Sequence, residues 1–276
     1  MGEPGSFGSS EVHVNLIYQY WIGDMRSGVY ASMDNMQQYA KRIGAAYRFD
    51  KDPNIASKLV DVPLYYEDMN PILDDSFLKY DKVLVVDMDV FAIDGLIKSI
   101  FDLPITDVGI CTEPQQPEMR ARLSGHICGA KDEIWARAIK DKYGIDAPRN
   151  EAGLLKVYNT GVLVFSKAGM QKARQRFAPF QEYVDTVRKA GLSKFYTIDQ
   201  NYFHAMMVKH LDYTELDNGW NSYVHYVGSA SDKPRPINDS RNESTKFVHI
   251  QLRGADDFDA DKLWRITNRP QNEWKI

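Results

Sequence analysis

The chain has 276 residues, of which 43% are hydrophobic, so it is long enough to bury the core of one large domain. Its 38 acidic residues outnumber its 34 basic ones and give a net charge of -4. This balance argues against nucleic acid or an anionic membrane as an electrostatic partner. No apolar run approaches the roughly 18 residues of a transmembrane helix, and we expect no transmembrane segment.

The first ten residues and the cysteines indicate the compartment. Residues 1–10 carry neither the basic nor the apolar region of a signal peptide, so we expect a flexible tail or a cloning remnant there. Cys111 and Cys128 lack the spacing of a metal site or a redox motif, which favours two core residues in a reduced, cytoplasmic setting. We therefore divide the chain into a tail, 1–10, and one domain, 11–276.

Strand and helix patterns alternate along most of the domain. The segment 30–43 has apolar residues at helical spacing and ends at Gly44, a residue typical of helix C-caps. The expected strands are 12–20, 46–49, 82–86, 108–112, 156–165 and 246–250, and the expected helices are 30–43, 64–79, 95–101, 132–143, 170–189 and 197–207. This order predicts a single α/β domain with a Rossmann-like, mostly parallel central sheet flanked by helices.

The most informative segment joins an apolar strand to two acids. Residues 83–86 are all Val or Leu, which is typical of a strand buried on both faces, and Asp87 and Asp89 follow at once. Acids at the carboxyl edge of a parallel sheet lie where such sheets bind ligands. Two carboxylates repel each other unless a cation lies between them. The pattern predicts a metal-held phosphorylated ligand, whereas the alternative is a pair of solvated turn acids.

Phosphatases of the haloacid dehalogenase type also place Asp-x-Asp after an apolar strand. In such an enzyme Asp87 would be the nucleophile. Their motif lies near the start of the fold, whereas here two expected strands and two expected helices precede it. That order disfavours the phosphatase but leaves it as the alternative enzyme.

Asp87-Met-Asp89 behind its strand resembles the DxD motif of GT-A glycosyltransferases, and most closely that of the glycogenin/galactosyltransferase-like family 8. Four later segments resemble motifs of that family in the same order. They are Asn159-Thr160-Gly161, Asp199-Gln200-Asn201, Asn218-Gly219-Trp220-Asn221, and His249 followed by Gly254. The resemblance implies the GT-A fold, a nucleotide-sugar donor, with a UDP-sugar favoured, and a carbohydrate or glycoconjugate acceptor.

The resemblance also implies a set of metal ligands. Asp89 and His249 would bind the metal directly, and Asp87 would either bind it or contact the ribose. An Asp/His ligand set that also receives phosphate oxygens suits Mn²⁺ at least as well as Mg²⁺. Such a cation stabilises the negative charge that develops on the leaving diphosphate. Gln200 matches the position beneath the reacting anomeric carbon, and Asp199 is either catalytic or a helix N-cap.

The remaining candidates each have a structural alternative. Asn159 and Gly161 would face the donor sugar or simply form a β-bulge, Trp220 would stack on a sugar ring or lie in the core, and one of Tyr18 and Tyr20 would contact the base. In His249-Ile-Gln-Leu-Arg-Gly254 the glycine lies further from the histidine than in the family, so Arg253 is the candidate for the phosphate-binding lysine. This departure leaves retention or inversion open. We expect the polar segment 228–244 to border the diphosphate. A non-catalytic nucleotide-sugar binding module is the other alternative.

Overall fold

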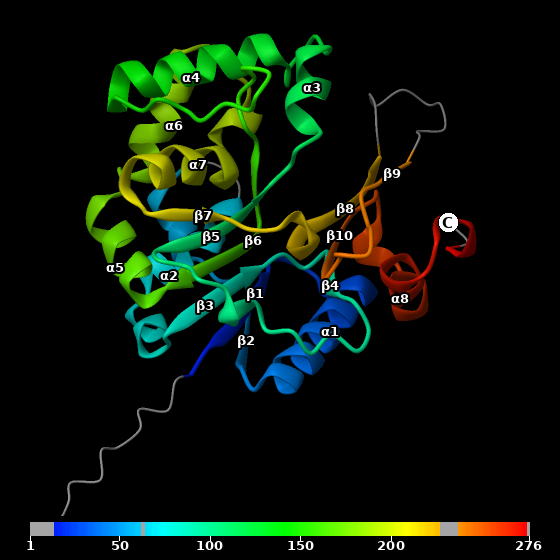
Figure 1. The fold of residues 1–276 in the computed structure, drawn as a ribbon. Helices are drawn as coiled ribbons and strands as arrows, with labels where there is room; N and C mark the ends of the chain where they lie inside the picture. Colours follow the sequence, from blue (N-terminus) through cyan, green and yellow to red (C-terminus); the bar gives the residue numbers. More distant parts are fainter. Residues whose placement is uncertain (1–13, 62–63, 227–236, 275–276) are drawn as a thin grey trace, which may run out of the picture.

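The computed structural model of the chain describes residues 14–61, 64–226 and 237–274. The predicted tail, the first two residues of the predicted strand 12–20 and most of the polar segment 228–244 lie outside these ranges. The described residues form a large mixed α/β layer, with a smaller sheet beside it that continues into the C-terminal helix (Figure 1). Hydrophobic cores on both faces of the large sheet stabilise this arrangement.

The main sheet has six strands in the order β2-β1-β3-β6-β5-β7. Only β6 is antiparallel to its neighbours, so the prediction of a mostly parallel sheet is confirmed. The strands are β1 (Leu16–Trp21), β2 (Ala46–Lys51), β3 (Lys82–Val86), β5 (Val108–Thr112), β6 (Tyr158–Ser166) and β7 (Tyr213–Glu215).

Alternating side chains of β3 show how the sheet is buried on both faces. Val83 and Val85 belong to a core built with the helices after β6, and Leu84 and Val86 belong to a second core built with α1. The helices are α1 (Ser27–Ile43), α2 (Asn70–Leu73), α3 (Gln116–Ala121), α4 (Gly129–Tyr143), α5 (Lys167–Arg176), α6 (Phe180–Lys189), α7 (Asp199–His210) and α8 (Ala260–Asn268). This double burial explains why β3 reads as an uninterrupted apolar run.

A second sheet, which the sequence did not predict, contains four short strands in the order β4-β10-β8-β9. They are β4 (Val90–Ala92), β8 (Ser222–Tyr226), β9 (Ile237–Asp239) and β10 (Phe247–Gln251). Strand β4 starts immediately after Asp89 and pairs antiparallel with β10, where Val90 lies opposite His249. The two acids therefore lie at the junction of the two sheets.

Three predicted helices need correction. The segment 95–101 is not a helix, because only a 3₁₀ turn at Ile100–Asp102 forms there. The segment 170–189 is two helices, α5 and α6, separated by residues 177–179, where Pro179 stands just before α6. Proline lacks the N–H that a continuous helix would need at this point. The stretch 64–79 consists of 3₁₀ turns around the short α2.

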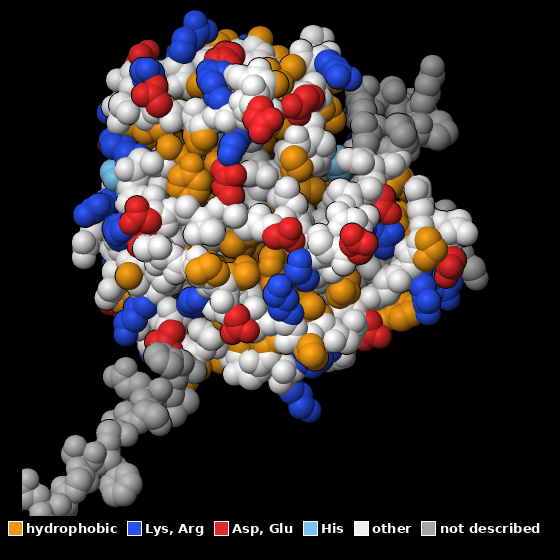
Figure 2. Space-filling model, in the orientation of Figure 1, with side chains coloured by type: hydrophobic (Ala, Val, Ile, Leu, Met, Phe, Trp, Pro, Cys, Tyr) orange, Lys and Arg blue, Asp and Glu red, His pale blue; other side chains and the backbone are white. Residues whose placement is uncertain are grey.

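Other features agree with the expectations. Gly44 and Gly144 end α1 and α4 with a φ of 70° at each, the left-handed conformation that glycine adopts without strain. Cys111 and Cys128 are free and buried. Acidic and basic side chains are interspersed over the face shown in Figure 2. None of the helices within the described ranges is long and apolar enough to cross a membrane.

Candidate metal and donor site

The backbone holds the Asp87–Asp89 turn to both sheets. The N–H of Asp87 donates to the carbonyl of Gly161 in β6 over 3.0 Å, and the carbonyl of Asp89 accepts from the N–H of Ile250 in β10 over 2.7 Å. The two carboxylates stay open to ligands, with side chains 35% and 40% exposed. A turn fixed at both ends presents them in a defined orientation.

His249 completes a cluster with these acids. Its Nε2 lies 3.1 Å from Oδ1 of Asp89 and 3.9 Å from Oδ2 of Asp87, and one potential ligand atom from each residue lies within 4.8 Å of the others. The histidine is almost fully buried, whereas the acids face the opening. Two carboxylate oxygens and one imidazole nitrogen form a donor set that suits Mn²⁺ or Mg²⁺ with further oxygen ligands.

A chain of amides determines which nitrogen of His249 faces the acids. The N–H of Gly161 donates to Oδ1 of Asn159 over 2.9 Å, so this atom is an acceptor, and Nδ2 of Asn221 donates to it over 2.9 Å. Oδ1 of Asn221 is then left to accept from Nδ1 of His249, 3.1 Å away. In the neutral imidazole this arrangement directs the Nε2 lone pair at two carboxylates. Such an arrangement needs a cation or a proton between them.

The pKa shifts of Asp87 and His249 reflect the same repulsion between the carboxylates and the His249 lone pair. Burial and the Asp89 carboxylate raise the pKa of Asp87 to about 7. Burial disfavours the charged form of His249, but the adjacent Asp89 outweighs it and raises the pKa of the imidazole to about 9. Without a metal, the cluster therefore retains a proton on His249 at neutral pH. A bound divalent cation would displace it.

Gly161 allows the cluster to form. A Cβ at this position would lie 2.6 Å from Cε1 of His249 and 2.8 Å from Oδ2 of Asp87. The strand register shifts here, because Ile110 pairs with Leu163 while Cys111 pairs with Asn159. The β-bulge that was the structural alternative for Asn159 and Gly161 is therefore present. At this bulge Nδ2 of Asn159 donates to Oε1 of Glu113 over 2.8 Å. Asn159 is buried and serves as a link in the amide chain.

A second acid pair lies at the start of α7. Asp199 is the first residue of that helix and accepts from the Thr160 hydroxyl over 2.8 Å. Asp68 is hydrogen-bonded to Asp199, and burial together with the charges of Asp199 and Asp87 raises the pKa of Asp68 well above its usual range. Burial raises the pKa of Asp199 as well, although its hydrogen bonds to Asp68 and Thr160 act in the opposite direction. Asp68 is therefore the member of the pair whose carboxyl group is the more strongly favoured in its protonated form.

An open cavity of about 470 Å³ adjoins the Asp87–Asp89 turn. Its walls are mainly apolar and aromatic, and Asp87, Asp89 and Asp256 supply the acidic side chains. The indole N–H of Trp21 donates to the carbonyl of Asp24 over 2.9 Å, which fixes that ring. The apolar lining consists of Tyr20, Trp21, Ile22, Val29, Met88, Phe91, Leu252 and Ala255. This volume and composition are typical of sites for a small organic ligand.

The structure places the predicted site residues at different positions relative to the cavity. Tyr20, Asp87 and Asp89 line the cavity, and His249, Asn159 and Gly161 stand behind the acids. Tyr18 lies in the core, where its hydroxyl accepts from Asn70 over 3.0 Å, so Tyr20 is the member of that pair at the cavity.

Trp220 is corrected to a core residue. Its ring is 1% exposed and packs edge-on against Phe247, which leaves no face for a sugar. Arg253 is exposed between the cavity residues Leu252 and Ala255. Gln200 faces a smaller cavity behind β6.

Three residues of the site were not predicted to have a role. Glu113 follows β5 as Asp87 follows β3, so its place after a strand is a signal that could have identified it. Asn221 belonged to a recognised motif without an assigned function. Asp68 lies in a stretch of 3₁₀ helix whose pattern carries no such signal.

No protein-family model matches the chain, and no curated protein matches it. A solved structure described as the WbbM bifunctional glycosyltransferase in apo form is similar, with a TM-score of 0.51, 13% identity, and coverage of 79% of this chain and 41% of that one. This chain thus spans about two fifths of the WbbM chain.

Two further structures are similar at lower TM-scores. A glycosyltransferase involved in glycosylation of the major capsid of PBCV-1 has a TM-score of 0.45, 11% identity, and coverage of 86% and 92% of the two chains. Mouse xyloside xylosyltransferase 1 has a TM-score of 0.46, 14% identity, and coverage of 76% and 88%. The resemblance to WbbM covers most of this chain, and the chain therefore has the mixed α/β fold of a glycosyltransferase.

Proposed function

We propose that this protein is a metal-dependent glycosyltransferase that moves a sugar from a nucleotide diphosphate donor, with a UDP-sugar favoured, to a carbohydrate or glycoconjugate. The observation that carries the proposal is the convergence of His249 on Asp87 and Asp89 beside the cavity, in a fold found in a glycosyltransferase. About 160 residues separate the acids from His249 in the sequence, so only the fold brings them together.

The residues present fit a divalent cation. The Nε2 lone pair of His249 and the two carboxylates converge, and the amide chain through Asn221 and Asn159 orients the ring. Asp87, Asp89 and His249 would hold Mn²⁺ or Mg²⁺, which when bound offsets the charge of the donor diphosphate and of the leaving group.

Other residues would position the donor. Tyr20 and Trp21 offer aromatic surface for a nucleotide base. Arg253, whose side chain makes no hydrogen bond or ion pair within the described ranges, would bind the diphosphate. Its loop is anchored to α1, because Arg26 pairs with Asp256 at 2.7 Å and with Asp257 at 3.0 Å. Val29 of α1 and Asp256 of this loop both line the cavity, so a bound donor would lie against both elements.

The reacting sugar would lie on the β6 side of the acids, near Asp199 and Gln200. Thr160 and Asp68 fix the buried Asp199 carboxylate through hydrogen bonds, so its charge can respond to charge at the reacting carbon. Gln200, the next residue of α7, is the candidate for contact with the anomeric centre.

Release of nucleoside diphosphate tests the proposal. A panel of nucleotide sugars, each incubated with the protein with and without Mn²⁺, should include at least one that yields nucleoside diphosphate only with the metal. A donor that binds should also raise the melting temperature in the presence of Mn²⁺.

An assay with a generic aryl phosphate distinguishes the proposed glycosyltransferase from the alternative enzyme, a phosphatase. Phosphate release that is strong in the wild type and lost in Asp87→Asn would identify a phosphatase and overturn the proposal. Donor binding without turnover by any acceptor in a glycan library would identify a binding module.

A further inference from the structure

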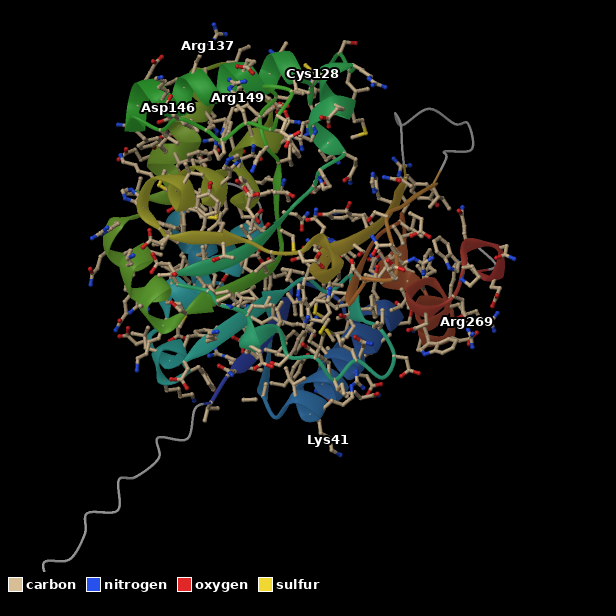
Figure 3. All side chains as sticks on the ribbon, in the orientation of Figure 1. Lys41, Cys128, Arg137, Asp146, Arg149 and Arg269 are labelled. Atoms are coloured by element: carbon tan, nitrogen blue, oxygen red, sulfur yellow. The ribbon has the colours of Figure 1, made fainter. Side chains whose placement is uncertain are left out.

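Strands β5 and β6 are antiparallel neighbours that a short turn could connect, yet the chain inserts residues 113–157 between them. This excursion forms α3 and α4, which lie over α7 in Figure 1. Cys128 marks the junction of α3 and α4 in Figure 3, and Arg149 holds the returning segment to α4 through a bidentate ion pair with Glu133 at 2.7 and 2.8 Å. The excursion encloses the first turns of α7.

A small cavity of about 20 Å³ lies beneath this cover. Gln200, Asn201 and His204 of α7 line it, and Arg120, Asp132 and Trp135 of the excursion lie opposite. This volume accommodates one water molecule and nothing larger, since a water needs about 10–15 Å³ of such space. The walls are polar on both sides, which separates this cavity from the apolar voids that remain dry.

Two polar atoms in its walls lack partners. Nε2 of His204 and Oδ1 of Asn201 are buried and make no hydrogen bond to any described residue, and their residues are 5% and 7% exposed. A buried polar atom left without a partner is costly, so native proteins satisfy such atoms, often with an internal water. A single water can donate to Oδ1 of Asn201 and bond to Nε2 of His204 at the same time.

Two aromatic rings fix the position of the His204 ring. The centroid of the His204 ring lies 4.9 Å from that of Trp135 and 4.7 Å from that of Tyr158. Burial, with the nearby Arg120 guanidinium, lowers the pKa of His204 to about 3, so the imidazole stays neutral. Arg120 itself is paired with Asp132, which in turn accepts from the Tyr196 hydroxyl over 2.7 Å. The surrounding charges are therefore satisfied, and only the two orphan atoms remain.

We infer that one structural water occupies this cavity, bound by His204 and Asn201, and that His204 acts through it as a positioning residue for the Gln200–Asn201 turn. The positioning role rests on the proposed function, whereas the water itself does not. Asn201 follows Gln200 directly, so fixing the amide of Asn201 fixes the first turn of α7 and the backbone that carries Gln200. The excursion thus places a polar support behind the candidate catalytic segment.

A crystal structure of the unmutated protein at high resolution is the first test. We expect a single density peak within hydrogen-bond distance of both Nε2 of His204 and Oδ1 of Asn201. A well-ordered cavity with no density would overturn the inference. This measurement does not depend on enzyme activity, so it stands even if no sugar transfer is found.

Matched variants test the positioning role. His204→Phe keeps a ring against Trp135 and Tyr158 but removes both nitrogens, and His204→Gln restores a polar end. We expect His204→Phe to lose the water and to lower kcat roughly 10- to 100-fold with the donor KM little changed, because displacement by about 1 Å can cost that much. His204→Gln should recover most of the loss, and His210→Phe, on the same helix but outside the cavity, should leave kcat unchanged.

Two outcomes would reject the role. An unchanged kcat in a His204→Phe protein that has lost the water would show that the water supports structure only. An equal loss in His204→Phe and His204→Gln would show that ring packing, not the hydrogen bond, matters. Absence of activity in the unmutated protein with every donor would contradict the proposed function instead.

Discussion

Two pairs of aspartates, close together in the fold, hold their negative charge in different ways. Asp87 and Asp89 are 35% and 40% exposed and face a histidine, whereas Asp68 and Asp199 are 3% and 5% exposed and are hydrogen-bonded to each other. The first pair is open and needs a positive partner, which His249 or a cation can supply. The second pair is sealed and retains a proton, because burial and neighbouring carboxylates raise the pKa of Asp68. The comparison favours our proposal that the open pair binds a metal ion, and it makes the sealed pair a structural support.

The largest effect should come from removing one charge of the open pair. In Asp89→Asn we expect Mn²⁺-dependent binding of UDP to weaken by about 100-fold or more, because the amide is a poorer ligand and the closest carboxylate to His249 is lost. Isothermal titration calorimetry with UDP and Mn²⁺ measures this affinity. The matched control is Asp94→Asn, an exposed acid of the same segment that should bind as the wild type does. Equal affinity in wild type and Asp89→Asn would refute the metal assignment.

Loss of the histidine should have a smaller effect on the same cluster. His249→Ala leaves both carboxylates in place, so we expect Mn²⁺-dependent affinity for UDP to fall by about 10- to 100-fold. Metal-independent binding of the nucleoside should be unaffected, since the aromatic cavity walls are unchanged. Calorimetry with and without Mn²⁺ separates these contributions. A loss of the same size in both titrations would assign His249 to folding rather than to the metal.

The open pair also predicts a pH dependence of metal affinity. The pKa of Asp87 is raised to about 7 and that of His249 to about 9, so between pH 6 and pH 8 the metal must displace protons. Affinity for Mn²⁺ should therefore rise with pH, by up to about tenfold per unit for each proton displaced. Calorimetry in two buffers of different ionisation enthalpy counts the released protons. Constant affinity across this range would contradict the cluster's charge state.

The sealed pair should change stability rather than binding. Because the pKa of Asp68 is raised on folding, folded protein binds a proton that unfolded protein releases above its pKa of about 3.9. Stability should thus fall as pH rises from that value toward the folded pKa. Asp68→Asn, which can still donate to Asp199, should flatten this decline and unfold at a higher urea concentration at pH 8 than the wild type.

The matched measurement is at pH 5, where the difference should shrink because wild-type Asp68 is protonated in the folded state and part of the unfolded population carries the proton as well. Asp94→Asn, at an exposed acid, should show no such pH-dependent gain. An Asp68→Asn protein that parallels the wild type at both pH values would indicate that the pair does not share a proton.

The strands whose bounds local pattern predicted to the residue are interior strands of the main sheet. Residues 82–86 and 108–112 are strands with the predicted bounds, because a continuous apolar run has few other stable solutions in a helix-covered sheet. The three-residue strands β4, β7 and β9 were missed, since three residues carry no detectable period and form a strand only by pairing with a neighbour. The break at residues 177–179 was missed although Pro179 was visible, because amphipathic spacing continues on both sides of it.

The residues of the candidate site also differ in whether local sequence pattern could identify them. Asp87 and Asp89 could be identified from the sequence because their position after a buried strand is a local property, and the later motifs followed from a resemblance. Asp68 could not be assigned from pattern, since its role depends on its interaction with Asp199 across the fold. The place of Glu113 after β5 makes it a candidate, but its bond to Asn159 depends on the tertiary structure. The same applies to Trp220, whose burial against Phe247 depends on the second sheet.

The sequence alone determined the alternation of strands and helices, the acids at the edge of the central sheet and the glycines that end α1 and α4, because these depend on spacing and on single-residue conformational freedom. Only the tertiary structure decided that β10 would bring His249 to those acids. It also decided that Gly161 would leave room for the histidine ring, and that the acid pair at α7 would be sealed from water. Burial and charge pairing between distant segments arise when the chain closes on itself, and no local pattern encodes them.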